Sequence, residues 1–103
     1  MMKFVIIQCV KAYHSELEQI FKSIEVDSYS EMDVEGFMRK NPKEGEFSNW
    51  FGSAANPYNY MVSFTFLAAD KADKLLKRIE NFNESIEEMS PMNAYIMNVE
   101  KSI

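Results

Sequence analysis

One cysteine and one histidine lie close together near the N-terminus, and this pair is the first to consider for catalysis. Cys9 stands in an apolar run, and His14 follows it a few residues later. A histidine that takes the proton of a thiol creates a nucleophile, but only when the two side chains are within hydrogen-bond distance. A strand-to-helix turn between them does not bring them together. We therefore expect a buried thiol, a solvent-exposed histidine and no catalytic residues.

The methionines near Pro91 are weak candidates for metal binding. Met89 and Met92 flank this proline, and thioether sulfurs favour Cu(I). Methionine more often fills irregular gaps in a core, and three of the eight methionines, Met32, Met61 and Met97, lie at positions typical of strands. The preceding glutamates have carboxylates that suit a hard cation, but their spacing is also that of an exposed helix end. These residues are Glu84, Glu87 and Glu88.

The longest segment without periodicity, residues 38–59, contains an unusual number of aromatic side chains. Connections of this length in compact domains are either disordered or functional, and the only tryptophan of the chain argues for function. We expect these aromatic residues to contact a partner protein or to fold back onto the sheet. They are Phe47, Trp50, Phe51 and Tyr58. Arg39 and Lys40 stand at the base of this loop and could hold an anion, although surface pairs of basic residues are common.

The apolar pattern changes period along the chain and predicts six elements. A continuous apolar run predicts a strand buried on both faces, and alternation predicts a half-exposed edge strand. Ser15 and Glu18 form a capping box for the first helix, and Asp70 caps the second. The predicted order is a strand over 3–10, a helix over 15–24, strands over 28–37 and 60–67, a helix over 70–82 and a strand over 94–99.

This order of elements predicts a single α+β domain spanning residues 1–103. Strand, helix, strand, strand, helix, strand is the ferredoxin-like arrangement, in which two helices lie on one face of a four-stranded antiparallel sheet. The other face is left uncovered. Because the first strand is apolar on both sides, either Val5, Ile7 and Cys9 or their neighbours would be exposed there. We expect a homo-oligomer packed through this face, or a lid made by the loop.

Composition excludes several classes of function. The chain has 103 residues and a net charge of -5, which disfavours nucleic acid as a partner. No apolar run is long enough for direct membrane insertion, and nothing resembles a secretory signal. One cysteine excludes an internal disulfide, so a cytoplasmic location is expected.

The first half of the chain resembles the start of the PII signal-transduction proteins. In that family a strand, a helix and a Val-x-Gly-Phe-Gly-Arg strand end lead into a long effector loop. The matching residues here are Val34, Glu35, Gly36, Phe37 and Arg39, and the long loop follows them. The resemblance implies a regulatory homotrimer with ligand clefts between subunits. It implies a ligand site at Ser30, Gly36, Arg39 and Lys40.

Departures from the family pattern argue against ATP binding in the usual PII manner. The segment 81–91, where the family has a glycine-rich phosphate loop, contains no glycine and three glutamates. The arginines of the family's tail are absent from the last residues, and Met38 replaces the second glycine. The loop also lacks the tyrosine segment that is modified in PII proteins. The sequence names no cofactor, and we expect a different ligand or a protein target.

Two other functions remain open. Metal-tolerance proteins of the CutA type share the ferredoxin-like fold and the trimeric assembly. A small ferredoxin-like enzyme, such as a dimeric monooxygenase, would need an enclosed pocket with a convergent polar group. The strands carry few polar side chains and no acid–base pair, so a PII-like regulatory protein is favoured over an enzyme.

Overall fold

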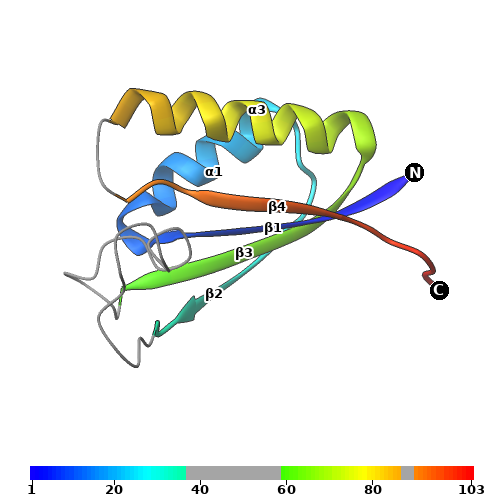
Figure 1. Ribbon diagram of the computed structural model, residues 1–103, viewed down its shortest axis with the longest axis horizontal. Coiled ribbons are helices and arrows are strands. Elements are labelled where there is room, and N and C mark those ends of the chain that lie inside the picture. The colour runs from blue at the N-terminus through cyan, green and yellow to red at the C-terminus, as the bar shows by residue number, and fades with distance from the viewer. Residues whose placement is uncertain (37–58, 87–89) are drawn as a thin grey trace, which may run out of the picture.

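The fold is a four-stranded antiparallel sheet with both helices on one face (Figure 1). The structure is a computed structural model, and it describes residues 1–36, 59–86 and 90–103. The strands lie in the order β2-β3-β1-β4. The predicted ferredoxin-like α+β fold is confirmed. The elements are β1 (Met2–Val10), a short 3-10 turn (Lys11–Tyr13), α1 (His14–Ser23), β2 (Ser30–Val34), β3 (Tyr60–Ala68), α3 (Ala69–Ile86) and β4 (Asn93–Asn98).

The positions of the strands follow from their patterns. β1 and β3 are central and pair along their whole lengths, from Met2 opposite Ala68 to Val10 opposite Tyr60. β2 lies at an edge, as its alternation predicts, and β4 forms the other edge. β2 is shorter than expected. The segment just before β2 is held to β3 by a side-chain hydrogen bond and not by strand pairing. The Thr65 hydroxyl donates to the Ser28 carbonyl at 2.7 Å.

The predicted helix caps are wrong. α1 begins at His14, one residue before Ser15, and its N-cap residue Tyr13 makes no side-chain cap hydrogen bond. The start of the helix is instead tied to β2 by a contact between His14 Nε2 and Glu31 Oε2 at 2.9 Å. Asp70 lies inside the first turn of α3, because β3 runs directly into the helix at Ala69.

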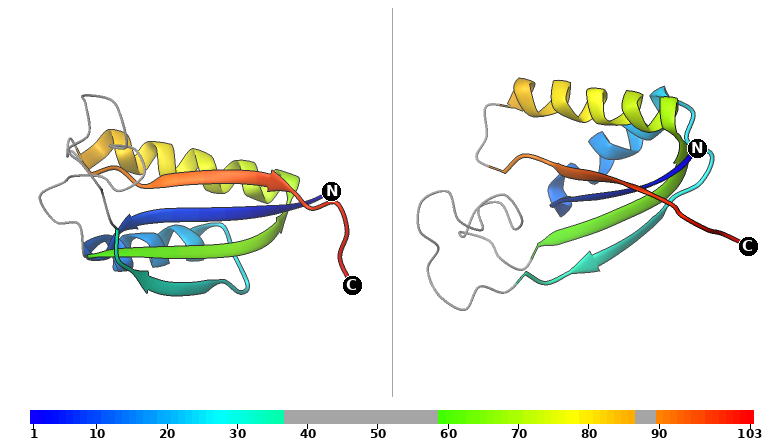
Figure 2. Two further views of the ribbon diagram at one scale, coloured as in Figure 1. Left: turned by 60° about the horizontal axis from the view of Figure 1, so that its bottom comes forward. Right: turned by 45° about the vertical axis from the view of Figure 1, so that its right-hand side comes forward.

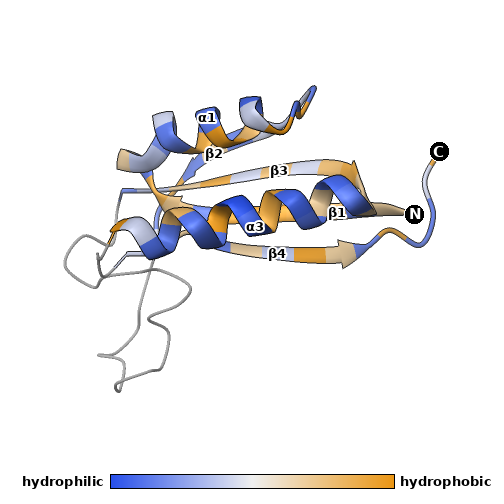
Figure 3. Ribbon diagram, turned by 90° about the horizontal axis from the view of Figure 1, so that it is seen from above, coloured by the Kyte–Doolittle hydropathy of each residue, from blue (hydrophilic) through white to orange (hydrophobic). Residues whose placement is uncertain are grey.

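The core lies between the helices and alternate residues of the two central strands. Val5, Ile7 and Cys9 of β1 point to the helices and are at most 2% exposed. Hydrophilic residues dominate the outer side of α3 when the molecule is seen from above the helices (Figure 3). The helix residues that pack into this core are fully or nearly fully buried. They include Leu17, Phe21, Ala72, Leu75 and Ile79.

No helix of the described residues lies over the opposite face of the sheet, as two further views show (Figure 2). We call it the open face. Its aromatic residues form a cluster in which the ring of Phe4 lies 5.8 Å from Phe64 and 5.1 Å from Phe66, between centroids. Phe66 is 57% exposed, and Met32 is 51% exposed. The alternation of side chains along the strands assigns the other members, which include Ile6, Gln8, Val62, Asn93, Tyr95 and Met97.

The end of α1 is followed by a residue in the left-handed conformation. Glu25 has a φ of 58° and is the one non-glycine residue with positive φ in the described ranges. Its N–H donates to the Lys22 carbonyl, and the following Val26 N–H donates to the Phe21 carbonyl, so the left-handed turn closes the helix.

Replacing Glu25 by glycine is expected to stabilise the fold by about 0.5–1 kcal/mol, because glycine adopts this conformation without a Cβ clash. Denaturant unfolding of the purified protein measures the change. Glu25→Ala is the control, since it removes the same carboxylate but keeps the clash. An equal gain from both variants would show that charge, not backbone strain, limits stability here.

Candidate functional site

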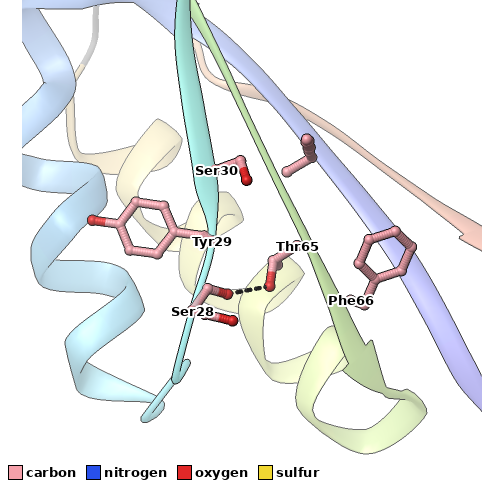
Figure 4. Close-up of a pocket in the computed structure, with 6 residues that line it drawn as sticks. Ser28, Tyr29, Ser30, Thr65 and Phe66 are labelled. Carbon is pink, nitrogen blue, oxygen red and sulfur yellow. Dashed lines mark hydrogen bonds between the residues drawn. The ribbon is translucent and has the colours of Figure 1, made fainter.

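A hollow of about 170 Å³ lies where the start of β2 meets β3 (Figure 4). The Ser28 and Ser30 side chains are exposed at its rim, and Phe66 supplies an exposed aromatic ring. Tyr29 turns the other way, towards α1, where its ring lies 4.1 Å from that of Phe21. The lining residues are Ser28, Tyr29, Ser30, Phe64, Thr65 and Phe66.

The chemistry of this hollow suits part of a ligand with a flat ring and hydrogen-bonding edges. Two hydroxyls offer donors and acceptors, and Phe66 offers a face for stacking. Burial is the main cause that raises the pKa of Tyr29, with smaller contributions from Glu18 and Glu31, so this phenol stays protonated at neutral pH. Pockets that enclose a whole small molecule usually measure about 300–1,000 Å³. This hollow therefore supplies only part of such a site.

Two polar side-chain contacts hold the edge strand β2 against the turn and helix that follow β1. Lys11 Nζ lies 2.7 Å from Asp33 Oδ2, and His14 lies beside Glu31. The Ser63 hydroxyl donates to the other Glu31 oxygen at 3.4 Å. Exposed pairs contribute about 0.2–1 kcal/mol each. They position β2, and with it the hollow, more than they stabilise the fold.

The residues considered for catalysis do not form a nucleophile. Cys9 is 2% exposed, and burial raises the pKa of its thiol to about 12, helped by the nearby carboxylates of Glu31 and Glu16. His14 is bound to Glu31 rather than to the thiol. The expected buried thiol and exposed histidine are both confirmed.

The predicted ligand residues lie at opposite ends of β2. Ser30 begins the strand and lines the hollow, whereas Gly36 lies beyond its other end and is buried. Six residues of extended chain span about 20 Å, so a small ligand cannot contact both in one copy. The other predicted site residues lie outside the described parts of the chain. They are Arg39, Lys40, Phe47, Trp50, Phe51 and Tyr58, all within the loop 38–59.

Of the two weak metal candidates, only Met92 lies in the described part of the chain. Met89 falls outside the described residues, and Met92 is 2% exposed. The main chain of Met92 is bonded in both directions to the Asn83 side chain, with both distances 2.9 Å. This arrangement makes Met92 a core residue that fixes the turn from α3 into β4. Across the part of the chain that is described, no three His, Cys, Asp or Glu residues gather as a metal site.

Sequence reasoning missed most of the hollow. Ser30 was named only through the family resemblance, while Ser28, Thr65 and Phe66 belong to no motif. The usable signal was the alternation in β3, where small polar residues lie between aromatic ones. It shows that two chemically different faces exist but does not say which one the helices cover.

Known structures share this arrangement of elements, although no protein-family model and no curated protein matches the sequence. A protein from Thermus thermophilus, described as PII-like in signalling, superposes with a TM-score of 0.64 at 17% identity, covering 95% of this chain and 86% of that one. CPII from Thiomonas intermedia, a nitrogen regulatory PII-like protein bound to ADP, AMP and bicarbonate, gives 0.64 at 14% identity, covering 99% and 96%.

The chain has the PII-like fold. The apo form of CPII superposes with a TM-score of 0.63 at 10% identity, over 95% of this chain and 90% of that one. Within the described ranges, no helix is long and apolar enough to cross a membrane.

Stability at high pH tests the environment of Cys9. The folded thiol has a pKa of about 12 against its ordinary value of 9.0, so the unfolded chain loses its proton first as the pH rises. Stability should fall between pH 9 and pH 12, and the contribution at pH 10 relative to pH 8 is about 1.4 kcal/mol.

Unfolding free energies of the native protein and of Cys9→Ala, each measured at pH 8 and pH 10, isolate this contribution. The native protein should lose about 1.4 kcal/mol more than the variant. Identical losses would mean that the thiol ionises as easily in the folded protein as in the unfolded chain.

Proposed function

We propose that this chain is a PII-like regulatory protein that assembles as a homotrimer and responds to a small ligand. The observation that carries the proposal is the uncharged, aromatic open face of the sheet, with Phe66 57% exposed at one end. Antiparallel sheets with one solvated face normally place polar residues there. A large apolar face instead marks an interaction surface.

A second and third copy of the same chain are the proposed cover for this face. Identical chains usually assemble with closed cyclic symmetry, and the PII-like fold favours three subunits. Charged residues are absent from the described part of the open face, so copies can approach without burying an unpaired charge. Six of the sixteen acidic residues of the chain lie on α1 and α3.

Ligand binding is proposed at a cleft between two copies. The hollow at Ser30 supplies one wall, and the loop base near Gly36 of a neighbouring copy supplies the other, because one copy cannot bring both together. CPII is bound to ADP and AMP, and an adenine ring has the flat face and polar edges that suit this hollow. The acidic, glycine-free segment 81–91 disfavours a triphosphate, so we propose AMP or ADP over ATP.

The loop 38–59 is proposed to transmit the state of the cleft to a protein target. Arg39 and Lys40 would contact the anionic part of the ligand, and the aromatic residues would contact the partner. Trp50 is the only tryptophan, so its fluorescence reports on this loop alone.

Substitution of Phe66 tests the assembly. The native protein should have a mass near 36 kDa, three times 12.0 kDa, by native mass spectrometry. Phe66→Glu buries a charge in the proposed interface and should leave mainly monomer. Lys77→Glu, on an exposed position of α3, is the matched control and should remain trimeric. A native protein that is monomeric at micromolar concentration would disprove the trimer.

Nucleotide titration tests the cleft. AMP and ADP should raise the melting temperature and shift the Trp50 emission, and ATP should do so at least tenfold more weakly. Ser30→Leu fills the hollow and should abolish both responses, whereas Ser85→Leu on the outside of α3 should retain them. A trimer that shows no response to any of the three nucleotides would overturn the nucleotide assignment and leave the assembly standing.

A further inference from the structure

The outer edge of β4 is the border of the sheet that no other described strand pairs. On its inner edge β4 pairs with β1 in unbroken register, and the Val99 N–H donates to the Met2 carbonyl at 3.3 Å. Antiparallel strands direct the main-chain groups of successive residues to alternate sides, so the N–H and C=O of Ala94 and Ile96 point away from β1. These groups lie in the plane of the sheet. Copies of the chain packed on the open face therefore do not pair them.

The first outward-facing residue along this edge already has a partner. Met92, just before β4, donates its N–H to Asn83 Oδ1 and accepts from Asn83 Nδ2, with both distances 2.9 Å. An amide side chain thus takes the place of a neighbouring strand at Met92. No hydrogen bond within the described ranges continues this pairing to Ala94 and Ile96. An unpaired edge of this kind is a template for a strand from another chain.

A hollow of about 350 Å³ lies directly beside this edge, between α3 and β4, and we call it the β4 groove. The helix runs alongside the strand when the molecule is seen from above (Figure 3). Leu76 and Ile79 of α3 and the buried Met92 supply apolar walls, and Glu80 is exposed at the rim. Side chains of a strand point to alternate faces. Every second side chain of a strand added to β4 would therefore point towards this groove.

The charges of α3 beside the β4 groove determine the chemistry of a suitable partner. Asp73, Glu80 and Glu84 are exposed and recur after seven and four residues, which places them on the side of the helix next to β4. Lys77 lies near them and leaves this rim net acidic. Lys71 lies on the other side, where its Nζ donates to a main-chain carbonyl just after α1 at 2.8 Å. A cation on the added strand would complement the acidic rim.

The edges of a second copy of this chain do not supply that cation. A second β4 edge would bring an identical acidic rim against the first. The other edge strand, β2, carries Glu31 and Asp33, and the nearby Lys11 is already paired with Asp33 at 2.7 Å. A strand from a different protein can place a lysine or an arginine opposite Glu80 without this conflict.

We propose that the outer edge of β4 binds an extended, basic segment of a partner protein by strand addition. The main chain of the segment pairs with Ala94 and Ile96, an apolar side chain enters the β4 groove, and a lysine or arginine pairs with Glu80. This surface goes beyond the proposed function, since it is separate from the nucleotide cleft and from the loop 38–59 and depends on neither.

Hydrogen exchange of the β4 amides, followed by ¹H–¹⁵N NMR of the full chain, tests the edge directly. The probe is a short peptide of alternating lysine and valine with both ends blocked. It should slow the exchange of the Ala94 and Ile96 amides at least tenfold, because they gain acceptors. The Tyr95 amide, which points to β1, should not change. A matching peptide of alternating glutamate and valine should give no protection at the same concentration.

Two pairs of variants separate the parts of the site. Glu80→Lys should weaken probe binding about fivefold, the loss expected for one exposed ion pair, whereas Glu16→Lys makes the same charge change on α1 and should bind normally. Ala94→Pro removes one outward N–H and should abolish binding. Ala94→Gly keeps this N–H and should retain binding.

Three results would contradict the proposal. If the Ala94 and Ile96 amides exchange as slowly as that of Tyr95 before peptide is added, another copy or another part of this chain already pairs with the edge. If they stay fast at millimolar peptide, the edge accepts no strand. Equal protection by the two peptides would overturn the assignment to a basic partner.

Discussion

The structure depends on a single constraint, which is that both helices cover the same face of an apolar sheet. Right-handed connections place α1 and α3 on one side, and the central strand β1 carries apolar residues on both. One set of side chains, including Val5 and Ile7, is buried in the core as a result. The other set, including Phe4 and Ile6, needs a different cover. The proposed assembly follows from this division.

The sequence predicted which elements form but not which face the helices take. The continuous apolar run of residues 3–10 identified a central strand, because only a strand buried on both sides has that pattern. Because both sides of such a strand are apolar, the pattern could not indicate which side the helices cover. In β3 the helices cover Ser63 and Thr65, and Phe64 and Phe66 face away from them. Small side chains beneath a helix allow it to approach the sheet closely, and this packing outweighs the greater hydrophobicity of phenylalanine.

The candidate site was less predictable than the fold, because which residues lie together there depends on the backbone conformation and not on their spacing in the sequence. Ser30 and Gly36 are near in sequence, but the extended backbone of β2 separates them. The hollow uses Ser28 at a position where the strand has not yet begun. The capping motif at Ser15 failed for a related reason. A long-range pair between His14 and Glu31 fixes the start of α1, and no local pattern contains that pair.

Assembly and ligand binding are thermodynamically linked if the proposed cleft lies between copies. A ligand that contacts two subunits binds the assembled protein and has no complete site on a separate chain, so binding favours assembly. Reciprocity then requires that assembly raises ligand affinity by the same factor. In the proposed assembly, the apolar open face would provide most of the association energy, and the small hollow would add a ligand-dependent part. A regulatory protein built in this way responds over a range of ligand concentration that its subunit interface helps to set.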